Sequence, residues 1–455
     1  MLYRLLKIIF SFAVSKYFVR INVLNEDRIP MDKPMLLLPN HRSAFMDPIA
    51  LATQLKRTTF FLARGESFNN SIMVKLFKRL KMIPIFRKDH NPEKTHQNKD
   101  IFRYCHKLME EKGCLMIFPE GICQTKYVLA PLKTGAAKIA LEAEHKNDYA
   151  LDLHIVPVGI NYSNPHRFRG NLTLNVGMPI KPKDYKQAYQ EDAWKAVNQL
   201  TGDIDKELRD LIILFEDQGQ LDVVQHIENL IGSMNNLTPL SEMDWFAKRR
   251  FLSSVVGNLA MHQPDDYNEF RIQLQQYYGG LRRLKVNQSY LPDRNIGLGV
   301  STSFWGLSLL LVVGFPLFLL GFLLHIVPFV LTRFVALKVV KRVDFMGSVA
   351  LALGVFFFTT FGLAQVWLCF EMTHSWLITM IFALSWPSLG LFAYGYLADS
   401  VKWNDQMRWI RVRSNHARLG ADLVTMKEQL VEKSKDLVQT YIAHQKKGAV
   451  ETTDN

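Results

Sequence analysis

The sequence predicts an α/β fold, a mixed sheet flanked by helices, followed by an all-α extension and transmembrane helices. Three observations support this prediction. In residues 21–190, short apolar runs alternate with amphipathic helical patterns, as in a sheet whose faces are covered by helices. Residues 191–294 are rich in helical patterns and poor in strand patterns. Residues 295–399 contain apolar segments long enough to cross a bilayer, which takes about 20 residues.

Composition and charge indicate which partners to expect. The chain has 455 residues, of which 48% are hydrophobic, and its formal net charge is +13. A positive charge of this size favours anionic partners: nucleic acid, acidic lipid headgroups or a phosphate-rich acyl carrier. The long apolar segments favour the last two. The sequence has neither a basic cluster interleaved with aromatic residues nor a zinc-type spacing, the features that would favour a nucleic-acid partner.

The cysteines indicate a reducing compartment and no disulfide framework or structural metal, because they lie in separate contexts without a Cys-x-x-Cys pair. They are Cys105, Cys114, Cys123 and Cys369. Cys123 lies near the expected site, but no recognisable histidine motif accompanies it. We therefore interpret Cys123 as a tolerated small residue and not as a nucleophile.

Residues 1–20 predict an N-terminal amphipathic, membrane-associated helix. Basic residues alternate with Leu, Ile, Phe and Tyr at roughly helical spacing, and no small-residue cleavage site follows. A helix lying on an anionic leaflet is the preferred interpretation. An uncleaved signal anchor and a helix of the protein core are the alternatives.

Four apolar runs in residues 21–190 end in a polar residue or contain a proline near the end, which is typical of strands that carry a site at one sheet edge. The runs are Met35–Leu38 before His41, Ile83–Phe86 before Arg87, Ile117–Pro119 before Glu120, and Ile155–Ile160. Asp47 follows His41 by six positions. A histidine with a carboxylate near its second ring nitrogen can remove the proton of an alcohol. Such a pair taken alone is more often part of a surface turn.

In this order the four blocks resemble the glycerophospholipid acyltransferase family, which includes glycerol-3-phosphate and 1-acylglycerol-3-phosphate acyltransferases. The resemblance covers about the first half of the chain and implies the mixed sheet of that family. It implies that His41 is the base that activates the acceptor hydroxyl and that Asp47 supports His41. Residues that it assigns to binding of the glycerol phosphate are Arg87, Glu120 and Gly121, with Arg64 where many members have a basic residue.

Lys133 is a secondary candidate for phosphate contact, independent of the resemblance. Lys133, Thr134 and Gly135 begin a predicted helix, and the free amides at a helix N-terminus bind anions.

Two departures from the commonest family pattern affect these assignments. Five residues separate His41 from Asp47 where four are usual, which resembles the fungal type of glycerol-3-phosphate acyltransferase. A bulge or a wider turn has to absorb the additional residue. After Gly121 the chain continues Ile-Cys-Gln where most members have Thr-Arg-Ser. One phosphate-binding arginine is therefore absent, and the identity of the acceptor stays open.

Residues 295–399 predict the membrane region, with transmembrane helices at 346–370 and 375–397. Glycines and prolines interrupt the apolar segment 304–330, and basic residues flank both of its ends. Basic residues mark the cytoplasmic side of a membrane, so both ends of segment 304–330 are expected to be cytoplasmic and the segment to be re-entrant or kinked. We expect an integral membrane protein whose catalytic domain lies on the cytoplasmic side. Residues 400–455 predict a C-terminal cytoplasmic amphipathic helix and tail, whose leucines at seven-residue spacing fit a short coiled coil or a helix docked on its own protein.

The expected function is that of a membrane-bound O-acyltransferase of phospholipid biosynthesis. A fatty acyl group would move from acyl-CoA or acyl-ACP to a hydroxyl of glycerol-3-phosphate or a lysophospholipid. The donor is a co-substrate, and neither a metal nor a cofactor is expected. The partners are therefore the lipid bilayer, the acceptor and the thioester donor, and the sequence does not fix an oligomeric state. The alternatives are an acyltransferase for another lipid acceptor and a non-catalytic membrane scaffold with an altered site.

Overall fold

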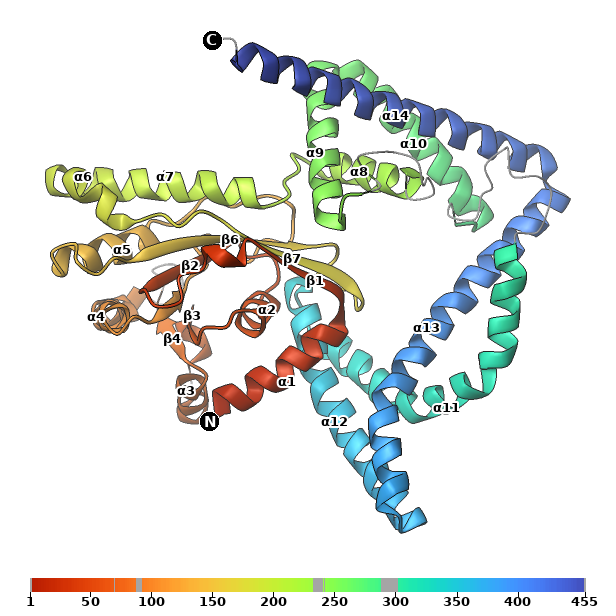
Figure 1. Ribbon diagram of the computed structural model, residues 1–455, viewed down its shortest axis with the longest axis horizontal. Helices are drawn as coiled ribbons and strands as arrows, with labels where there is room; N and C mark the ends of the chain where they lie inside the picture. Colours follow the sequence, from red (N-terminus) through yellow and green to blue (C-terminus); the bar gives the residue numbers. More distant parts are fainter. Residues whose placement is uncertain are drawn as a thin grey trace. The chain divides into compact units, whose positions relative to one another are not determined.

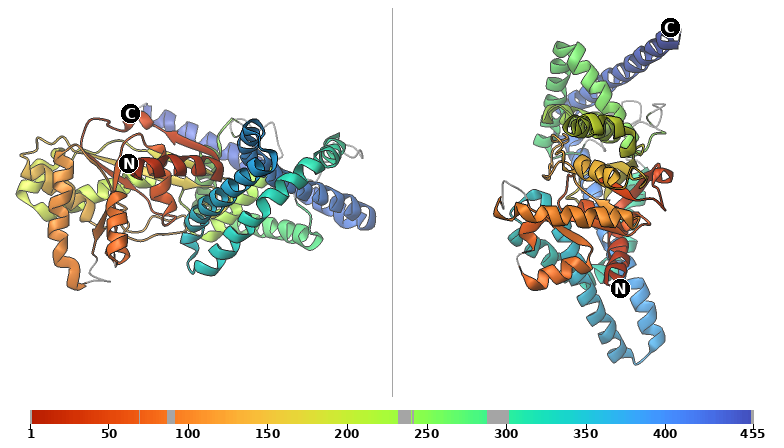
Figure 2. Two further views of the ribbon diagram at one scale, coloured as in Figure 1. Left: turned by 90° about the horizontal axis from the view of Figure 1, so that it is seen from below. Right: turned by 90° about the vertical axis from the view of Figure 1, so that its left-hand side faces the viewer.

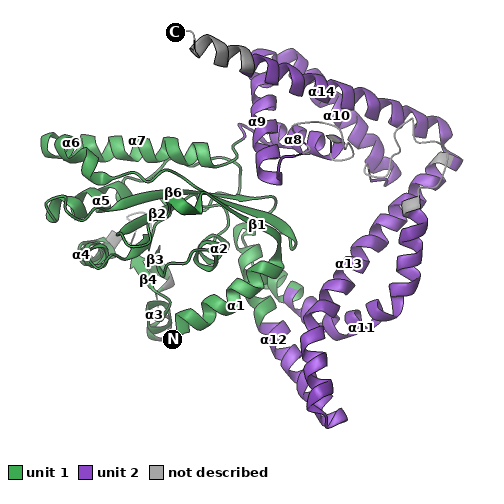
Figure 3. Ribbon diagram, in the orientation of Figure 1, with its two compact units in different colours: residues 1–214, 333–355 green, residues 215–332, 356–455 purple. Residues whose placement is uncertain are grey.

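The computed structural model describes residues 2–68, 70–86, 92–231, 240, 242–287 and 302–453. These residues fall into two compact units (Figure 3). Unit 1 comprises residues 1–214 and 333–355, and unit 2 comprises residues 215–332 and 356–455. Unit 1 is therefore discontinuous in sequence.

The described strands of unit 1 form one mixed sheet of seven strands, in the order β1-β7-β6-β2-β5-β3-β4 (Figure 1). The strands β6, β2, β5, β3 and β4 run parallel to one another, whereas β7 is antiparallel to β6 and parallel to β1. The strands are β1 (Phe18–Leu24), β2 (Met35–Pro39), β3 (Thr59–Arg64), β4 (Met82–Ile85), β5 (Cys114–Met116), β6 (His154–Tyr162) and β7 (Gly170–Val176). The predicted mixed sheet flanked by helices is confirmed.

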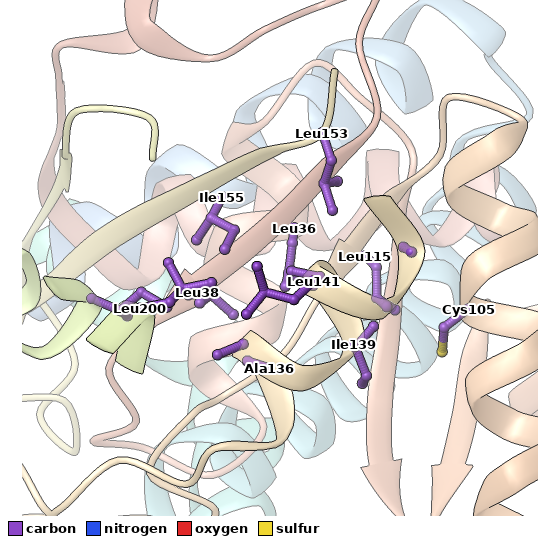
Figure 4. Packing of buried hydrophobic residues seen from close by; sticks show 14 of the residues in the cluster. Leu36, Leu38, Cys105, Leu115, Ala136, Ile139, Leu141, Leu153, Ile155 and Leu200 are labelled. Carbon is purple, nitrogen blue, oxygen red and sulfur yellow. The ribbon is translucent and has the colours of Figure 1, made fainter. Parts of the chain in front are cut away.

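Helices cover both faces of this sheet because alternate residues of its strands point to opposite sides. Met35 and Leu37 of β2 pack in one buried cluster with α1 (Leu2–Tyr17) and α2 (Met46–Gln54). Leu36 and Leu38 pack on the other face (Figure 4). The helices of that second face are α4 (Asn98–Glu110), α5 (Gly135–Lys146) and α7 (Ala193–Leu211). Two shorter helices, α3 (Ser71–Arg79) and α6 (Lys186–Glu191), complete the α-helices of the described part of residues 1–214.

The strand register brings the carboxyl ends of the parallel strands to one edge of the sheet. Leu37 pairs with Met116 near the ends of β2 and β5, and Arg64 pairs with Ile85 at the ends of β3 and β4. The carboxyl edge of parallel strands is the usual position of ligands in α/β folds. Since β6 is also parallel to β2, the carboxyl ends of β2, β4, β5 and β6 lie along the same edge, as the four apolar runs predict.

Unit 1 extends past the boundary at residue 190 that the sequence predicts. The helix α7, expected to belong to the helical extension, covers the sheet through the buried residues Leu200, Ile204 and Leu208. Its end lies very close to β6, where the side-chain amide of Asn161 donates to the carbonyl oxygen of Leu211 at 3.0 Å. The apolar stripe of α7 is thus part of the sheet's core.

Outside the three long apolar helices, the described residues of unit 2 are mainly helical, as expected for the extension. Its helices are α8 (Gln218–Ile231), α9 (Trp245–His262), α10 (Pro264–Leu284) and α14 (Ala417–Thr453). Leu423, Leu430 and Val438 of α14 are buried, and α14 contacts α8, α9 and α10. Of the two interpretations of the leucine spacing, the structure has the helix docked on its own protein.

Three further helices are long and apolar enough to cross a membrane, judged by length and composition. They are α11 (Thr302–Val339), α12 (Met346–Thr373) and α13 (Trp376–Asn415). The interrupted segment 304–330 lies in α11, one helix that contains Pro316 and Pro328 and that bends along its length (Figure 1). The helix α13 continues past the expected end at 397. Figure 2 shows α12 and α13 as an antiparallel pair joined by a short turn.

The close contact between β6 and α7 gives a test of the enlarged sheet domain. A Cβ atom on Gly159 would lie 2.2 Å from the carbonyl oxygen of Leu211. We expect Gly159→Ala to lower the free energy of unfolding by about 1–3 kcal/mol, because the packed helix end has to shift. The measurement is the thermal unfolding midpoint of the detergent-solubilised protein.

The matched control for this substitution is Gly202→Ala, in the exposed middle of α7, where a Cβ meets nothing within 4 Å. Alanine is the better helix former, so this variant should be stabilised by up to about 1 kcal/mol. Equal midpoints for the two variants would contradict the close packing of α7 on β6.

Candidate active site

His41 and Asp47 form a hydrogen-bonded pair at the carboxyl edge of the sheet. His41 lies in the turn after β2, and Asp47 is the second residue of α2. Nδ1 of His41 is 2.8 Å from Oδ2 of Asp47. The backbone amides of Arg42 and Ser43 donate to the same oxygen at 2.7 and 2.8 Å. The backbone of the turn therefore surrounds the Asp47 carboxylate. This wider turn accommodates the additional residue between His41 and Asp47.

This pairing determines what the imidazole of His41 can do. An ionised carboxylate only accepts hydrogen bonds, so Nδ1 carries the hydrogen and Nε2 is left as the basic nitrogen. The ring is stacked on Phe118, with ring centroids 4.1 Å apart, and the side chain is 17% exposed. His41 is therefore held in one orientation and still accessible to a substrate hydroxyl.

Tyr162, at the end of β6, is a further residue of the site that the sequence analysis did not identify. Its hydroxyl donates to Oδ1 of Asp47 at 2.8 Å, and its side chain is fully buried. Burial, and then the charge of Asp47, raise the pKa of Tyr162 well above its ordinary value. Tyr162 therefore stays protonated as a donor. The available signal is a tyrosine two residues after the fourth apolar run.

Glu120 stabilises the backbone of the turn that carries His41. Its Oε1 accepts from the amide of His41 at 2.6 Å, and its Oε2 accepts from the amide of Ala130 at 2.9 Å. The residue is 2% exposed, and burial raises the pKa of Glu120, an effect that the two backbone amides partly offset. On the other side of the turn, the side chain of Asn40 pairs with the backbone of Ile160 at 3.2 and 2.6 Å.

Arg42 connects the histidine turn to the loop after β5. Its guanidinium lies over the ring of Tyr127 at 3.5 Å and donates to the carbonyl oxygen of Thr125 at 3.2 Å. Burial lowers the pKa of Arg42, and the neighbouring Tyr127 and Asp47 oppose this shift. Arg42 therefore joins the turn after β2 to the loop after β5 through its guanidinium as well as through its backbone amide, which donates to Asp47.

Gly121 and Lys133 lie together beside Glu120. Gly121 has a φ of 68°, a backbone conformation that favours glycine. The side chain of Lys133 passes this glycine, since a Cβ on Gly121 would lie 3.4 Å from Cγ of Lys133. The helix α5 begins two residues later, at Gly135. A lysine and a helix N-terminus thus adjoin the third block.

The remaining predicted phosphate contacts are Arg64 and Arg87. Arg64 ends β3, two strand positions from β2 across β5, which is about 10 Å at the usual strand spacing. Arg87 lies outside the described residues, and β4 ends at Ile85 on the same edge.

Cys123 follows the third block, and its thiol is a poor nucleophile. Burial, and then the charges of Asp47 and Asp344, raise the pKa of this thiol. Because the thiolate is the reactive form, the electrostatic surroundings oppose a covalent role.

Parts of this chain are similar to known proteins. Residues 20–161 match the family model described as Acyltransferase. Glycerol-3-phosphate O-acyltransferase 1 of Saccharomyces cerevisiae is 36% identical over 131 residues, 28% of this chain and 17% of the yeast protein. Glycerol-3-phosphate O-acyltransferase 2 of the same yeast is 29% identical over 144 residues, 31% of this chain and 19% of that relative. The crystal structure of the 1-acyl-sn-glycerophosphate acyltransferase PlsC of Thermotoga maritima has a TM-score of 0.32 and 18% identity, covering 44% of this chain and 78% of that chain.

The chain therefore contains an acyltransferase-family domain, and the resemblance drawn from the four blocks is confirmed. The matched residues are less than a fifth of the length of the two yeast relatives. His41, Asp47 and Glu120 lie within the matched range 20–161, and Tyr162 is the first residue after this range.

The bond from Tyr162 to Asp47 gives a test of the site. We expect Tyr162→Phe to lower kcat about tenfold, because a buried bond to a charged group is lost. The KM for the acceptor should change little, because the fully buried Tyr162 acts on the reaction only through Asp47 and His41. The measurement is kcat and acceptor KM for both proteins.

Tyr185→Phe is the control, because the hydroxyl of Tyr185 donates to an exposed aspartate, Asp203, at 2.6 Å. Its kcat should match that of the unaltered chain. A Tyr162→Phe variant with an unchanged kcat, or with a lower kcat and a higher acceptor KM together, would assign the tyrosine to packing alone.

Proposed function

We propose that this chain is a membrane-bound O-acyltransferase that moves a fatty acyl group from acyl-CoA or acyl-ACP to a hydroxyl of glycerol-3-phosphate or a lysophospholipid. The observation that carries the proposal is the His41–Asp47 pair with its accessible Nε2, inside an acyltransferase-family domain. General-base catalysis of this kind contributes roughly 10²–10⁴-fold in rate. Positioning of the two substrates supplies much of the remainder.

The reaction proceeds by attack of the acceptor oxygen on the thioester carbonyl. Nε2 of His41 takes the hydroxyl proton as the new C–O bond forms. The C–S bond then breaks, and the departing thiolate takes the proton back from His41. Asp47 stabilises the imidazolium between these steps, and Tyr162 orients Asp47. Glu120 acts as a positioning residue through the backbone amide of His41.

The phosphate of the acceptor is proposed to bind on the side of Gly121 and Lys133. Gly121 lets the backbone approach the ligand, and Lys133 supplies a cation next to the N-terminus of α5. Lys133 thereby provides charge close to where Ile122-Cys123-Gln124 lacks the usual arginine. Arg64 and Arg87 remain proposed contacts at the ends of the neighbouring strands.

The catalytic domain is proposed to lie on the cytoplasmic surface of the bilayer, with α1 in the interface. Val14 and Tyr17 of α1 are buried in unit 1, whereas Leu5, Ile8 and Phe12 are 54%, 68% and 58% exposed. The exposed apolar residues are spaced by three and four positions, so they share one face of the helix. A helix with one face in its own protein and another in the lipid interface accounts for both sets.

Replacement of the proposed base tests the function directly. His41→Ala should reduce acyl transfer by roughly 10²–10⁴-fold while leaving vesicle association unchanged. The assay uses purified protein with palmitoyl-CoA or palmitoyl-ACP against glycerol-3-phosphate, lysophosphatidate and lysophosphatidylcholine. The control is His145→Ala, an exposed histidine on α5. Near-normal activity of His41→Ala would overturn the assignment, and an unaltered chain inactive with every acceptor would favour a non-catalytic scaffold.

The phosphate contact has its own test. Lys133→Ala should raise the KM for glycerol-3-phosphate about tenfold, because a charge-assisted bond is lost, with little change in the KM for the donor. The control is Lys138→Ala, in the first turn of α5, whose ammonium faces solvent beside Glu142. Equal acceptor KM values in the unaltered chain and Lys133→Ala would reject the contact.

A further inference from the structure

The connection between the first two apolar helices is part of the acyltransferase unit. Residues 333–355 belong to unit 1, although residues 215–332, which precede them, belong to unit 2. The connection contains the end of α11, the short helix η6 (Val343–Phe345) and the start of α12. A helix that is long and apolar enough to cross a membrane therefore begins inside the unit that carries His41.

Ser43 joins this connection directly to the carboxylate of Asp47. The backbone amide of Ser43 donates to Oδ2 of Asp47 at 2.8 Å, and the same oxygen lies 2.8 Å from Nδ1 of His41. The hydroxyl of Ser43 donates to the backbone oxygen of Asp344 at 3.4 Å, and Ser43 is completely buried. One residue of the turn thus bonds both to the partner of the proposed base and to η6.

The side chain of Asp344 joins the loop after β5 to the connection itself. Its carboxylate is hydrogen-bonded by the thiol of Cys123, and it accepts two bonds from Arg342, at 3.1 and 2.8 Å. Asp344 is 4% exposed. A buried charge needs partners of this kind. The carboxylate therefore fixes η6 against the loop that contains Cys123.

Two further contacts hold the connection against loops of the site. The ring of Phe345 meets the ring of Phe45 edge-on at a centroid distance of 5.6 Å. A Cβ atom on Gly347 would lie 2.4 Å from the carbonyl oxygen of Pro165, in the loop after β6. Residues 344–347 therefore contact the loops that follow β2, β5 and β6, three strands that run parallel to one another.

We infer that Asp344 is a positioning residue for the acyl transfer, an inference that rests on the proposed function. Its side chain fixes η6, and its backbone oxygen then holds Ser43, whose amide shares Oδ2 of Asp47 with the imidazole. Asp344 acts through the turn of residues 41–47 and not on the reacting atoms. The segment that starts α12, 301 positions from Ser43 in sequence, thereby sets the orientation of His41.

Loss of the Asp344 side chain should slow turnover and leave substrate binding in place. We expect Asp344→Ala to lower kcat roughly 10- to 100-fold with acceptor and donor KM values within about twofold, because a small displacement of a catalytic group is costly in rate. Asp344→Asn keeps the size of the side chain and one acceptor oxygen, so it should lower kcat less. It also serves as the test where the alanine variant does not fold. Both constants are measured per folded protein, with a palmitoyl thioester and the acceptor that the unaltered chain uses.

A double substitution separates positioning through Ser43 from a general loss of structure. Ser43→Ala removes the hydroxyl that donates to Asp344 and should also lower kcat. Because the two residues act through one contact, the loss in kcat of the Ser43→Ala, Asp344→Asn double variant should be smaller than the product of the two single losses. Single losses that multiply would overturn the route through Ser43.

The matched control is Val343→Ala, the neighbouring residue of η6, which is 65% exposed and whose replacement should leave kcat unchanged. Asp344 variants with an unchanged kcat, or with a lower kcat and higher KM values together, would overturn the inference. An unaltered chain that transfers no acyl group would instead overturn the proposed function, so the two failures are distinguishable.

Discussion

The buried carboxylate of Asp47 is the constraint on which the site depends. It is completely buried, yet it accepts hydrogen bonds from an imidazole, two backbone amides and the hydroxyl of Tyr162. A buried charge without such partners would cost several kcal/mol. Each donor also fixes a part of the fold: the turn after β2, the start of α2 and the end of β6. The carboxylate therefore holds the geometry of the turn as well as the orientation of His41.

The parallel part of the sheet explains why distant blocks of sequence meet. The strands β2, β5, β3 and β4 are neighbours and run the same way, so the residues after them share one edge. The backbone amide of His41 donates to Glu120, which joins the loops after β2 and β5, and the side chain of Asn40 donates to Ile160 of β6. His41, Glu120 and Arg64 thereby follow neighbouring strands along one edge of the sheet.

Much of this arrangement follows from local sequence pattern, and the parts that do not follow depend on long-range packing. The apolar runs predict β2, β4, β5 and β6 because a buried strand needs a continuous apolar stretch. The pairing of His41 with Asp47 follows from the family resemblance. Tyr162 was missed because its partner is 115 residues away in sequence. The sequence predicts α7 as part of the helical extension. Its amphipathic pattern shows that one face is buried, but it does not indicate whether that face packs on the sheet or on the other helices. No local signal connects Phe345 to Phe45.

The discontinuity of unit 1 gives the membrane region a structural role in the acyltransferase domain. Residues 215–332 lie between two parts of one compact unit, so the helical extension and most of α11 are an insertion in sequence. The returning part supplies Leu351 to the core around Tyr17 and Asp344 to the loops beside His41. Without that part, the apolar core and the hydroxyl of Ser43 would lose partners at the catalytic turn. The start of a helix that is long and apolar enough to cross a membrane is therefore part of the same compact unit as His41 and Asp47.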